Sequence, residues 1–305
     1  MKYLITSLLT TMMLTLSVAQ QLPASASFWT TNIENPSLIH PNFIKYDMPL
    51  TANASYRYQW VGLKDAPRTA LGNFQYFSED FHFLVGGTLI NDVTHPTGFT
   101  GLVLNGAYQL EFSQDLYATI GLSGGLYQYR VKGSDLKFLE GGDIASQNVN
   151  KLFPDFSVGA TLFFQNKYFI GLSVPQTLGL NLNFRKENND FNIQRVRHYY
   201  LTTGAIFSLE DDSWFEPTIN VKYLPNIPVL VDVLLKYERQ EIFWLGLGGA
   251  SSGKIHLEAG FILRANGYHN DSLFKLGYAF NQFFGEYGMN FGSAHEIKFT
   301  YSKTN

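Results

Sequence analysis

The sequence contains no cysteine, and charged residues are scarce: Asp, Glu, Lys and Arg make up 15% of its 305 residues. The missing thiols exclude disulfide bonds, thiolate metal sites and a lipid anchor on an N-terminal cysteine. The charged fraction lies well below the roughly 25% that is usual in soluble domains. With a formal net charge of −3, the chain also lacks the basic field that attracts nucleic acid. We therefore expect no nucleic-acid partner.

Long apolar runs are missing once the first 20 residues are passed. The segment from Leu4 to Leu16 is apolar, follows Lys2, and leads into small residues that end at Ala19. This order is typical of a secretory signal peptide, so residues 1–19 are predicted to be cleaved off near Ala19. A retained membrane helix is the alternative, but the run is short for the ~20 residues that a helical span needs.

Aromatic residues are abundant, at 16% of the chain, and they alternate with polar ones. Tyr56, Tyr58 and Trp60 alternate with Arg57 and Gln59, and a period of two places these sets on opposite faces of a strand. The same division recurs to the C-terminus. Tight turns and longer loops separate the segments in alternation; residues 78–80 are predicted to form a tight turn and residues 91–97 a loop.

The pattern predicts about fourteen strands of about ten residues, the length that a tilted strand needs to cross a bilayer. A soluble sandwich is the alternative, but its strands usually have only about 5–6 residues. In a bilayer, a closed barrel leaves no unpaired strand edge. We therefore predict an all-β fold: a transmembrane antiparallel β-barrel of residues 51–305, integral to the bacterial outer membrane. Residues 20–50, interrupted by Pro36, Pro41 and Pro49, are predicted to form an irregular periplasmic or plug segment.

Polar residues on the inward face are predicted to form a network in the lumen, namely Arg57, Gln59, Glu216, Lys222, Asp232, Glu258 and Glu296. A guanidinium group in the barrel wall needs water or a carboxylate, so Arg57 is expected to pair inside the lumen. Glu296 is a candidate partner because the last strand closes against the first; Glu216, Asp232 and Glu258 compete for this role. The mixed signs favour internal pairing over a selective pore, and a merely hydrated interior is the alternative.

No motif indicates an enzyme, a metal site or a cofactor. Residues 248–254 approach a phosphate-binding loop, but Ile255 stands where a magnesium-binding Ser or Thr is required and no βαβ unit surrounds it. A glycine-rich hairpin turn is the better interpretation. The histidines lack the spacing of metal ligands.

Several short segments resemble the PorP/SprF family of outer-membrane proteins from Bacteroidetes. They are Asn35-Pro36, residues 56–62 followed by Pro67-Arg68-Thr69, residues 154–159, residues 168–173 and His295-Glu296-Ile297. Their order and spacing extend over nearly the whole mature chain. The segment ending at Asn281 departs from the pattern, in which an Asp is expected at that position.

The resemblance implies a component of the type IX secretion and gliding machinery that helps to deliver or anchor large adhesins at the cell surface. It implies three kinds of partner: outer-membrane lipid, a secreted surface protein with a C-terminal sorting domain, and periplasmic secretion components. It does not imply an enzyme. A general porin or small-solute channel is the alternative, because a ~14-stranded barrel lies between small filled barrels and open 16–18-stranded porins.

Overall fold

A computed structural model gives the architecture of the chain. It describes residues 34–135, 148–179, 181–182, 193–194, 196–210, 212–225, 227–239, 242–266, 271–284 and 292–304. The predicted signal peptide, residues 1–19, and the first part of the predicted N-terminal segment, residues 20–33, lie outside this range.

The described chain is dominated by one large antiparallel sheet. Its strands are β1 (Leu50–Gln59), β2 (Arg68–Ser78), β3 (Phe83–Thr94), β4 (Thr97–Ser113), β5 (Leu116–Val131), β6 (Val149–Phe164), β7 (Tyr168–Val174), β10 (Tyr199–Ala205), β11 (Phe207–Leu209), β12 (Ser213–Tyr223), β13 (Leu230–Arg239), β14 (Phe243–Ala250), β15 (Lys254–Asn266), β16 (Asp271–Phe283) and β17 (Ala294–Lys303). β10 and β11 both pair with β12 and form one interrupted strand. The sheet is therefore a closed barrel of fourteen strands, which confirms the predicted fold class.

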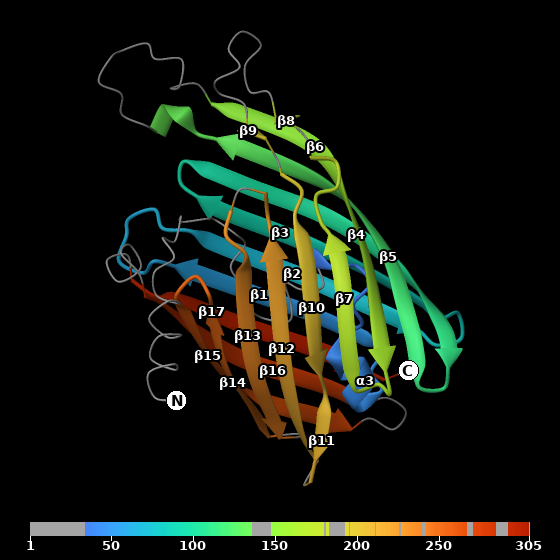
Figure 1. Ribbon diagram of the computed structural model, residues 1–305. Helices are drawn as coiled ribbons and strands as arrows, with labels where there is room; N and C mark the ends of the chain where they lie inside the picture. Colours follow the sequence, from blue (N-terminus) through green and yellow to red (C-terminus); the bar gives the residue numbers. More distant parts are fainter. Residues whose placement is uncertain are drawn as a thin grey trace, which may run out of the picture.

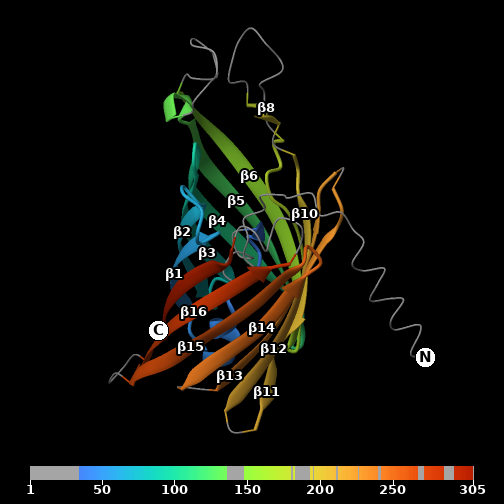
Figure 2. The same ribbon diagram turned by 90° about the vertical axis from the view of Figure 1, so that its left-hand side faces the viewer.

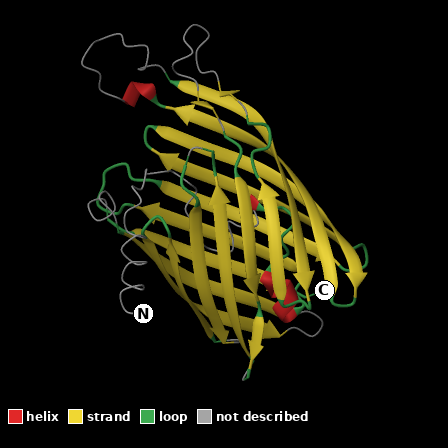
Figure 3. Cartoon of the chain, viewed as in Figure 1, coloured by secondary structure: helices red, strands yellow, loops and turns green. Residues whose placement is uncertain are grey.

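Each strand pairs with its neighbour in the sequence, and β1 pairs with β17 to close the barrel (Figures 1 and 3). Tight turns after β2, β4, β6, β11 and β13 lie at the same end as the C-terminus, whereas the other end carries the longer connections together with the tight turns after β3 and β14. We call these the tight-turn end and the loop end. β4, β5 and β6 are the longest strands, and their side of the barrel rises highest at the loop end (Figure 2). A two-stranded sheet of β8 (Asn181–Leu182) and β9 (Ile193–Gln194) lies at the loop end.

The two faces of the wall differ as the alternation predicts. Large apolar side chains point outward, among them Leu104 (60% exposed) and Leu122 (64%). Polar side chains point inward and are buried. In β1, Tyr56 is 49% exposed whereas Arg57 is 5% exposed. An apolar outer face and a polar inner face are what a membrane barrel requires.

Two local predictions were wrong. Trp60 was expected to continue the alternation of β1, but β1 ends at Gln59 and Trp60 adopts a left-handed backbone conformation with φ 57°. Residues 91–97 were expected to form a loop, but β3 extends to Thr94 and β4 begins at Thr97. Polar side chains at the end of β3 bond across the ladder, since Thr100 donates a hydrogen bond to Asn91 over 2.9 Å. A polar sequence therefore still forms a strand there.

Inside the barrel lies a short helix, α3 (Pro41–Tyr46), close to the tight-turn end. His40 caps it, since its Nδ1 accepts a hydrogen bond from the backbone NH of Asn42, and Pro41 presets the first turn. Asp47 ends it in a left-handed conformation with φ 54°. Among the described residues, no helix has the length and apolar character needed to cross a membrane.

Candidate functional site: a plugged and charged lumen

Residues 34–48 occupy the lumen, and we call them the plug. Leu38, Ile39 and Met48 are at most 1% exposed. Leu38 and Ile39 join a core cluster with inward side chains of β2–β7, while Met48 packs with Trp244 and other residues of β14–β16. Burying an aliphatic side chain of this size contributes about 1.5–3 kcal/mol. The plug is thus packed against both sides of the wall.

Glycines in the wall make room for the start of the plug. A Cβ atom at Gly159 would lie 2.2 Å from Oδ1 of Asn35, and one at Gly121 would lie 2.7 Å from the backbone of Pro36. At Gly171, a Cβ atom would lie 2.7 Å from Nδ2 of Asn35. Three glycines on three adjacent strands, β5, β6 and β7, therefore allow the plug backbone to approach the wall closely.

Hydrogen bonds hold the first part of the plug to the same side. Asn35 donates a hydrogen bond to the hydroxyl of Thr161 over 3.1 Å, and Thr119 donates one to the carbonyl of Ser37 over 2.5 Å. The hydroxyl groups of Ser37 and Thr161 are also 2.7 Å apart. All of these groups are buried. Because a buried polar group left without a partner costs about 1–3 kcal/mol, these contacts define where the plug binds.

The helix of the plug is attached to several strands at the tight-turn end. The backbone NH of His40 donates to Gln75 of β2 over 2.7 Å, and Asn42 donates to Ser302 of β17 over 2.8 Å. Burial, together with Lys275 and Lys45, lowers the pKa of His40 well below its usual value. His40 is therefore a neutral cap at physiological pH.

A charged cluster surrounds the helix, and we call it the lysine cluster: Lys45, Glu216, Lys236, Glu238 and Lys275. Lys45 of the plug is 2.5 Å from Glu216 and 2.8 Å from Glu238. Glu238 is fully buried, 2.6 Å from Lys275 and 3.2 Å from Lys236. Glu238 thus faces three ammonium groups, which compensate for its burial.

Tyr46 also donates a hydrogen bond to Glu238. Burial, followed by the nearby carboxylate of Glu238, raises the pKa of Tyr46. Tyr46 therefore stays protonated and acts only as a donor.

Two further sets of ion pairs lie in the lumen. Lys222 pairs with Glu34 of the plug over 3.1 Å, and Lys254 pairs with Asp232 over 3.2 Å. Burial raises the pKa of Glu34. In the other set, the carboxylate of Glu258 is 2.6 Å from Lys298 and 3.1 Å from Nε2 of His256.

The structure places Arg57 directly opposite Glu296 across the β1–β17 ladder that closes the barrel. The two side chains nevertheless form no ion pair: Nε, Nη1 and Nη2 of Arg57 and Oε2 of Glu296 have no hydrogen-bond partner among the described residues. The sequence therefore predicts correctly that Arg57 and Glu296 are neighbours, but the expected ion pair between them is absent. Of the competing acids, Glu216, Asp232 and Glu258 pair with lysines instead.

The predicted lumen residues are therefore distributed over several clusters. Six of the seven are at most 8% exposed and face the lumen: Arg57, Glu216, Lys222, Asp232, Glu258 and Glu296. Gln59 is partly exposed at the end of β1. The prediction omitted Glu238, although it continues the inward period of Asp232 and Lys236. It also omitted Lys45, whose role depends on the path of the plug, which no periodicity reveals.

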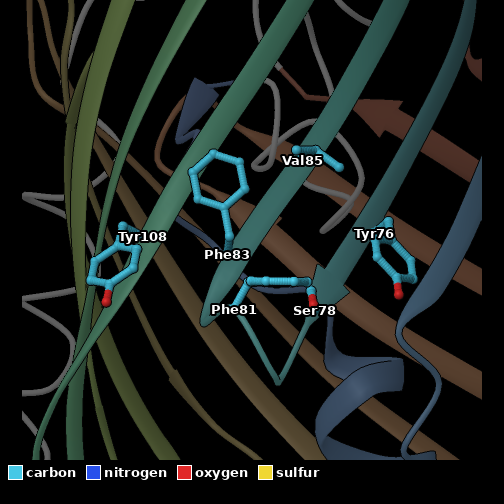
Figure 4. A pocket seen from close by; sticks show the side chains of 6 residues that line it. All are labelled: Tyr76, Ser78, Phe81, Phe83, Val85 and Tyr108. Atoms are coloured by element: carbon cyan, nitrogen blue, oxygen red, sulfur yellow. The ribbon is translucent and has the colours of Figure 1, made fainter.

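Neither the cavity on the outer face nor the acidic and histidine residues form a second candidate site among the described residues. A cavity of about 340 Å³ lies over β2–β4, lined by Tyr76, Ser78, Phe81, Phe83, Val85 and Tyr108 (Figure 4). Its lining includes Phe81, which is 75% exposed, so it belongs to the apolar outer face and not to the lumen. Within the described ranges, no group of three or more His, Cys, Asp or Glu residues is arranged to hold a metal ion.

A closed fourteen-stranded barrel, apolar outside and charged inside, defines the class: an integral β-barrel of the outer membrane. The sequence matches the family described as "Type IX secretion system membrane protein PorP/SprF" over residues 18–301. The chain belongs to the PorP/SprF family, which confirms the resemblance inferred from its sequence.

Solved structures with a similar shape share little sequence with this chain. A FadL homologue from Pseudomonas aeruginosa is 10% identical, with a TM-score of 0.49, and the alignment covers 90% of this chain and 97% of that one. The toluene transporter TodX from Pseudomonas putida is 8% identical, with a TM-score of 0.48 and coverages of 92% and 94%. No curated protein matches the sequence. The assignment therefore depends on the family match.

Proposed function

We propose that this protein is an outer-membrane component of type IX secretion that helps to deliver or anchor large surface proteins, such as adhesins, at the cell surface. The family match over residues 18–301 supports a role in this secretion system. Its partners would be a secreted protein with a C-terminal sorting domain and periplasmic components of the machinery. The protein would perform no chemistry itself.

The observation that carries this proposal is the plug. Residues 34–48 are packed and bonded inside the barrel, from Glu34 on Lys222 to Lys45 in the lysine cluster. An anchoring barrel does not need an open lumen, whereas a porin does. The plug therefore favours an anchoring role over the alternative of a general solute channel.

The proposed orientation places the tight-turn end in the periplasm and the loop end outside the cell. Outer-membrane barrels usually have short periplasmic turns and longer external loops. In this orientation Glu34, at the start of the plug, pairs with Lys222 toward the external end of β12, and helix α3 lies near the periplasmic rim. The loop end, with the raised strands β4–β6, would then present the surface that a secreted protein contacts.

Deleting the gene and comparing the proteins exposed on the cell surface tests the proposal. We expect one or a few proteins with C-terminal sorting domains to disappear from the surface and to return when the wild-type gene is restored. Surface labelling followed by mass spectrometry measures this. A surface proteome that is unchanged by the deletion, together with slower uptake of small solutes, would instead support a channel.

A further inference from the structure

Strand β6 rises beyond its neighbour β7 at the loop end. It has 16 residues and pairs with β5 along its whole length, whereas β7 has 7 residues and pairs with β6 only from Val158 onward. Residues 149–157 therefore extend past β7 by about 30 Å, at about 3.3 Å per residue (Figures 1 and 2). Among the residues that the structure describes, no strand pairs with this part of β6 on the side away from β5, since β8 and β9 form a separate sheet.

The backbone groups of alternate residues of β6 point to this unpaired side. The carbonyl of Phe156 accepts a hydrogen bond from the backbone NH of Thr177, which follows β7, over 2.9 Å. Phe156 thus directs its backbone groups away from β5, and every second residue of a regular strand does the same. These groups are the NH and carbonyl of Asn150 and Leu152 and the carbonyl of Pro154, and we call them the free edge.

The free edge stands where a partner can reach it. A tilted strand crosses the bilayer with about 9–11 residues, so a strand of 16 residues continues beyond the membrane at the loop end. In the proposed orientation this end lies outside the cell. Asn150 is exposed, and the side chain of Leu152 is 65% exposed. An exposed strand edge with unpaired donors and acceptors is a template for pairing with another chain.

We propose that the free edge binds an extended segment of the secreted surface protein by strand addition, an inference that rests on the proposed role in delivering or anchoring such a protein. The segment accepts hydrogen bonds from the NH groups of Asn150 and Leu152 and donates to the carbonyls of the free edge. Its outward side chains lie beside Leu152 and Phe156, which is 50% exposed. Cross-strand neighbours of such residues are favourable when they are apolar, so the segment carries apolar residues at alternate positions.

Two features favour a single extended segment over a second copy of the barrel. The added strand takes the place that a longer β7 would occupy, because β7 is the neighbour of β6 on this side of the sheet. One chain can follow that line, whereas a second barrel would have to bring its own closed wall to the same position. Pro154 also lacks an NH group, and prolines on strand edges discourage pairing between identical edges. Two facing copies would meet this missing donor twice, and a secreted segment meets it once.

A proline at position 152 tests the proposal in cells. Leu152→Pro removes one NH group from the free edge and leaves the ladder with β5 intact, and Pro154 shows that β6 accepts a proline at such a position. The probe is the secreted protein that disappears from the surface when the gene is deleted. Its surface amount should fall at least about tenfold in Leu152→Pro. The matched control is Leu152→Ala, which shortens the side chain but keeps the NH group, and it should lose at most about threefold.

Heat-modifiable gel mobility shows whether Leu152→Pro is folded. If it is not, amide hydrogen exchange on the wild-type barrel replaces it, with the barrel purified from cells that carry or lack the gene for the same secreted protein. The NH groups of Asn150 and Leu152 should exchange at least about tenfold more slowly when the secreted protein is present. The NH group of Lys151, which faces β5, is the internal control and should not change.

Three results would overturn the inference. A folded Leu152→Pro with a wild-type amount of the secreted protein at the surface, or equal exchange in the two preparations, contradicts it and leaves the proposed function standing. A gene deletion that changes no surface protein removes the proposed function and this inference together. The chain has no native cysteine, so a disulfide-linked dimer of Asn150→Cys in native membranes would assign the free edge to a second copy.

Discussion

Strands β2–β7 and strands β12–β17 with β1 face the same plug with different side chains. Ten buried charged residues lie on the second half, whereas Asp155 is the one buried charged residue that the described part of β2–β7 carries. The first half holds the plug by glycines, hydroxyl groups and apolar contacts, and we call it the neutral half. The second, charged half holds it by ion pairs, together with the packing of Met48 and the hydrogen bond from Asn42 to Ser302. The difference shows that shape fixes the position of the plug on one side and charge on the other.

The two kinds of attachment differ in the effect of losing one of the residues that take part. A buried ion cluster leaves uncompensated charges behind, whereas a glycine contact changes only the space available. In the lysine cluster, Lys45 of the plug forms the ion pair with Glu216, whereas Glu238 pairs with Lys236 and Lys275 of the wall as well as with Lys45. Without the plug, Glu216 and Lys222 of the wall would lose these ion-pair partners, so the plug completes the charge pairing of the charged half. The plug contacts of the neutral half involve no charged group: Asn35 and Ser37 bond to Thr119 and Thr161.

The largest effect is expected from Glu238→Ala in the charged half. It removes a fully buried carboxylate that faces three lysines, so the free energy of unfolding should fall by about 3–5 kcal/mol. Urea unfolding in detergent, followed by heat-modifiable gel mobility, measures it. Asp271→Asn is the matched control, since its ion pair with Arg264 is partly exposed and should cost less than about 1 kcal/mol. An equal decrease in the free energy of unfolding in the two variants would show that the lysine cluster contributes no more to stability than the partly exposed ion pair.

In the neutral half, Gly159→Ala should loosen the plug and leave the barrel folded. The new Cβ would lie 2.2 Å from Asn35, and overpacking of this kind costs about 1–3 kcal/mol. Limited proteolysis of residues 34–48 in the folded barrel reports the change. Gly72→Ala is the control, because nothing lies within 4 Å of a Cβ there. If both variants are cleaved at the wild-type rate, the glycines do not position the plug.

The smallest effect is a dependence on pH that arises at His40. Its pKa in the folded protein is lowered by burial and by Lys275, so the unfolded chain binds the proton more readily. The contribution of His40 to the free energy of unfolding is therefore fully present above about pH 6.5. It falls as the pH decreases below that value, by at most about 1.4 kcal/mol for each pH unit. Glu34, whose pKa is raised, acts in the opposite direction. Measuring the free energy of unfolding of the wild type and of His40→Asn at pH 7.5 and pH 5.5 separates the contribution of His40 from that of Glu34.

His40→Asn keeps an acceptor at the start of α3 without a group that titrates in this range. The difference between wild type and variant should grow as the pH falls. A constant difference would show that His40 is not the group responsible.

The sequence predicts the barrel well because period-two alternation is a local property. Tyr56 and Arg57 identify their faces without reference to any other strand. The pairing of the first and last strands follows from closure, and it brings Arg57 opposite Glu296. Whether two opposite side chains touch depends on rotamers and on the space between them, so the absence of that contact could not be foreseen. Glu238 could have been found, because it lies two residues after Lys236 on the same face.

The plug was harder to foresee. Its prolines indicate an irregular segment, but an irregular segment in the periplasm has the same signature as one inside the lumen. The contacts that place it, such as Asn35 with Thr161 and Asn42 with Ser302, join residues more than 100 positions apart. No local pattern contains that information.

Single-channel recording in planar bilayers tests the central claim, that the protein's own N-terminal segment closes the lumen. The chain has no native cysteine, so Asn42→Cys with Ser302→Cys can lock the plug to β17, where the two native side chains are 2.8 Å apart. Gly159→Leu should release it. We predict little steady current through the wild type, frequent open steps in Gly159→Leu, and closure of those steps when the cysteine pair is added and oxidised. Large, reproducible steps through the wild type that the oxidised pair does not alter would contradict the account.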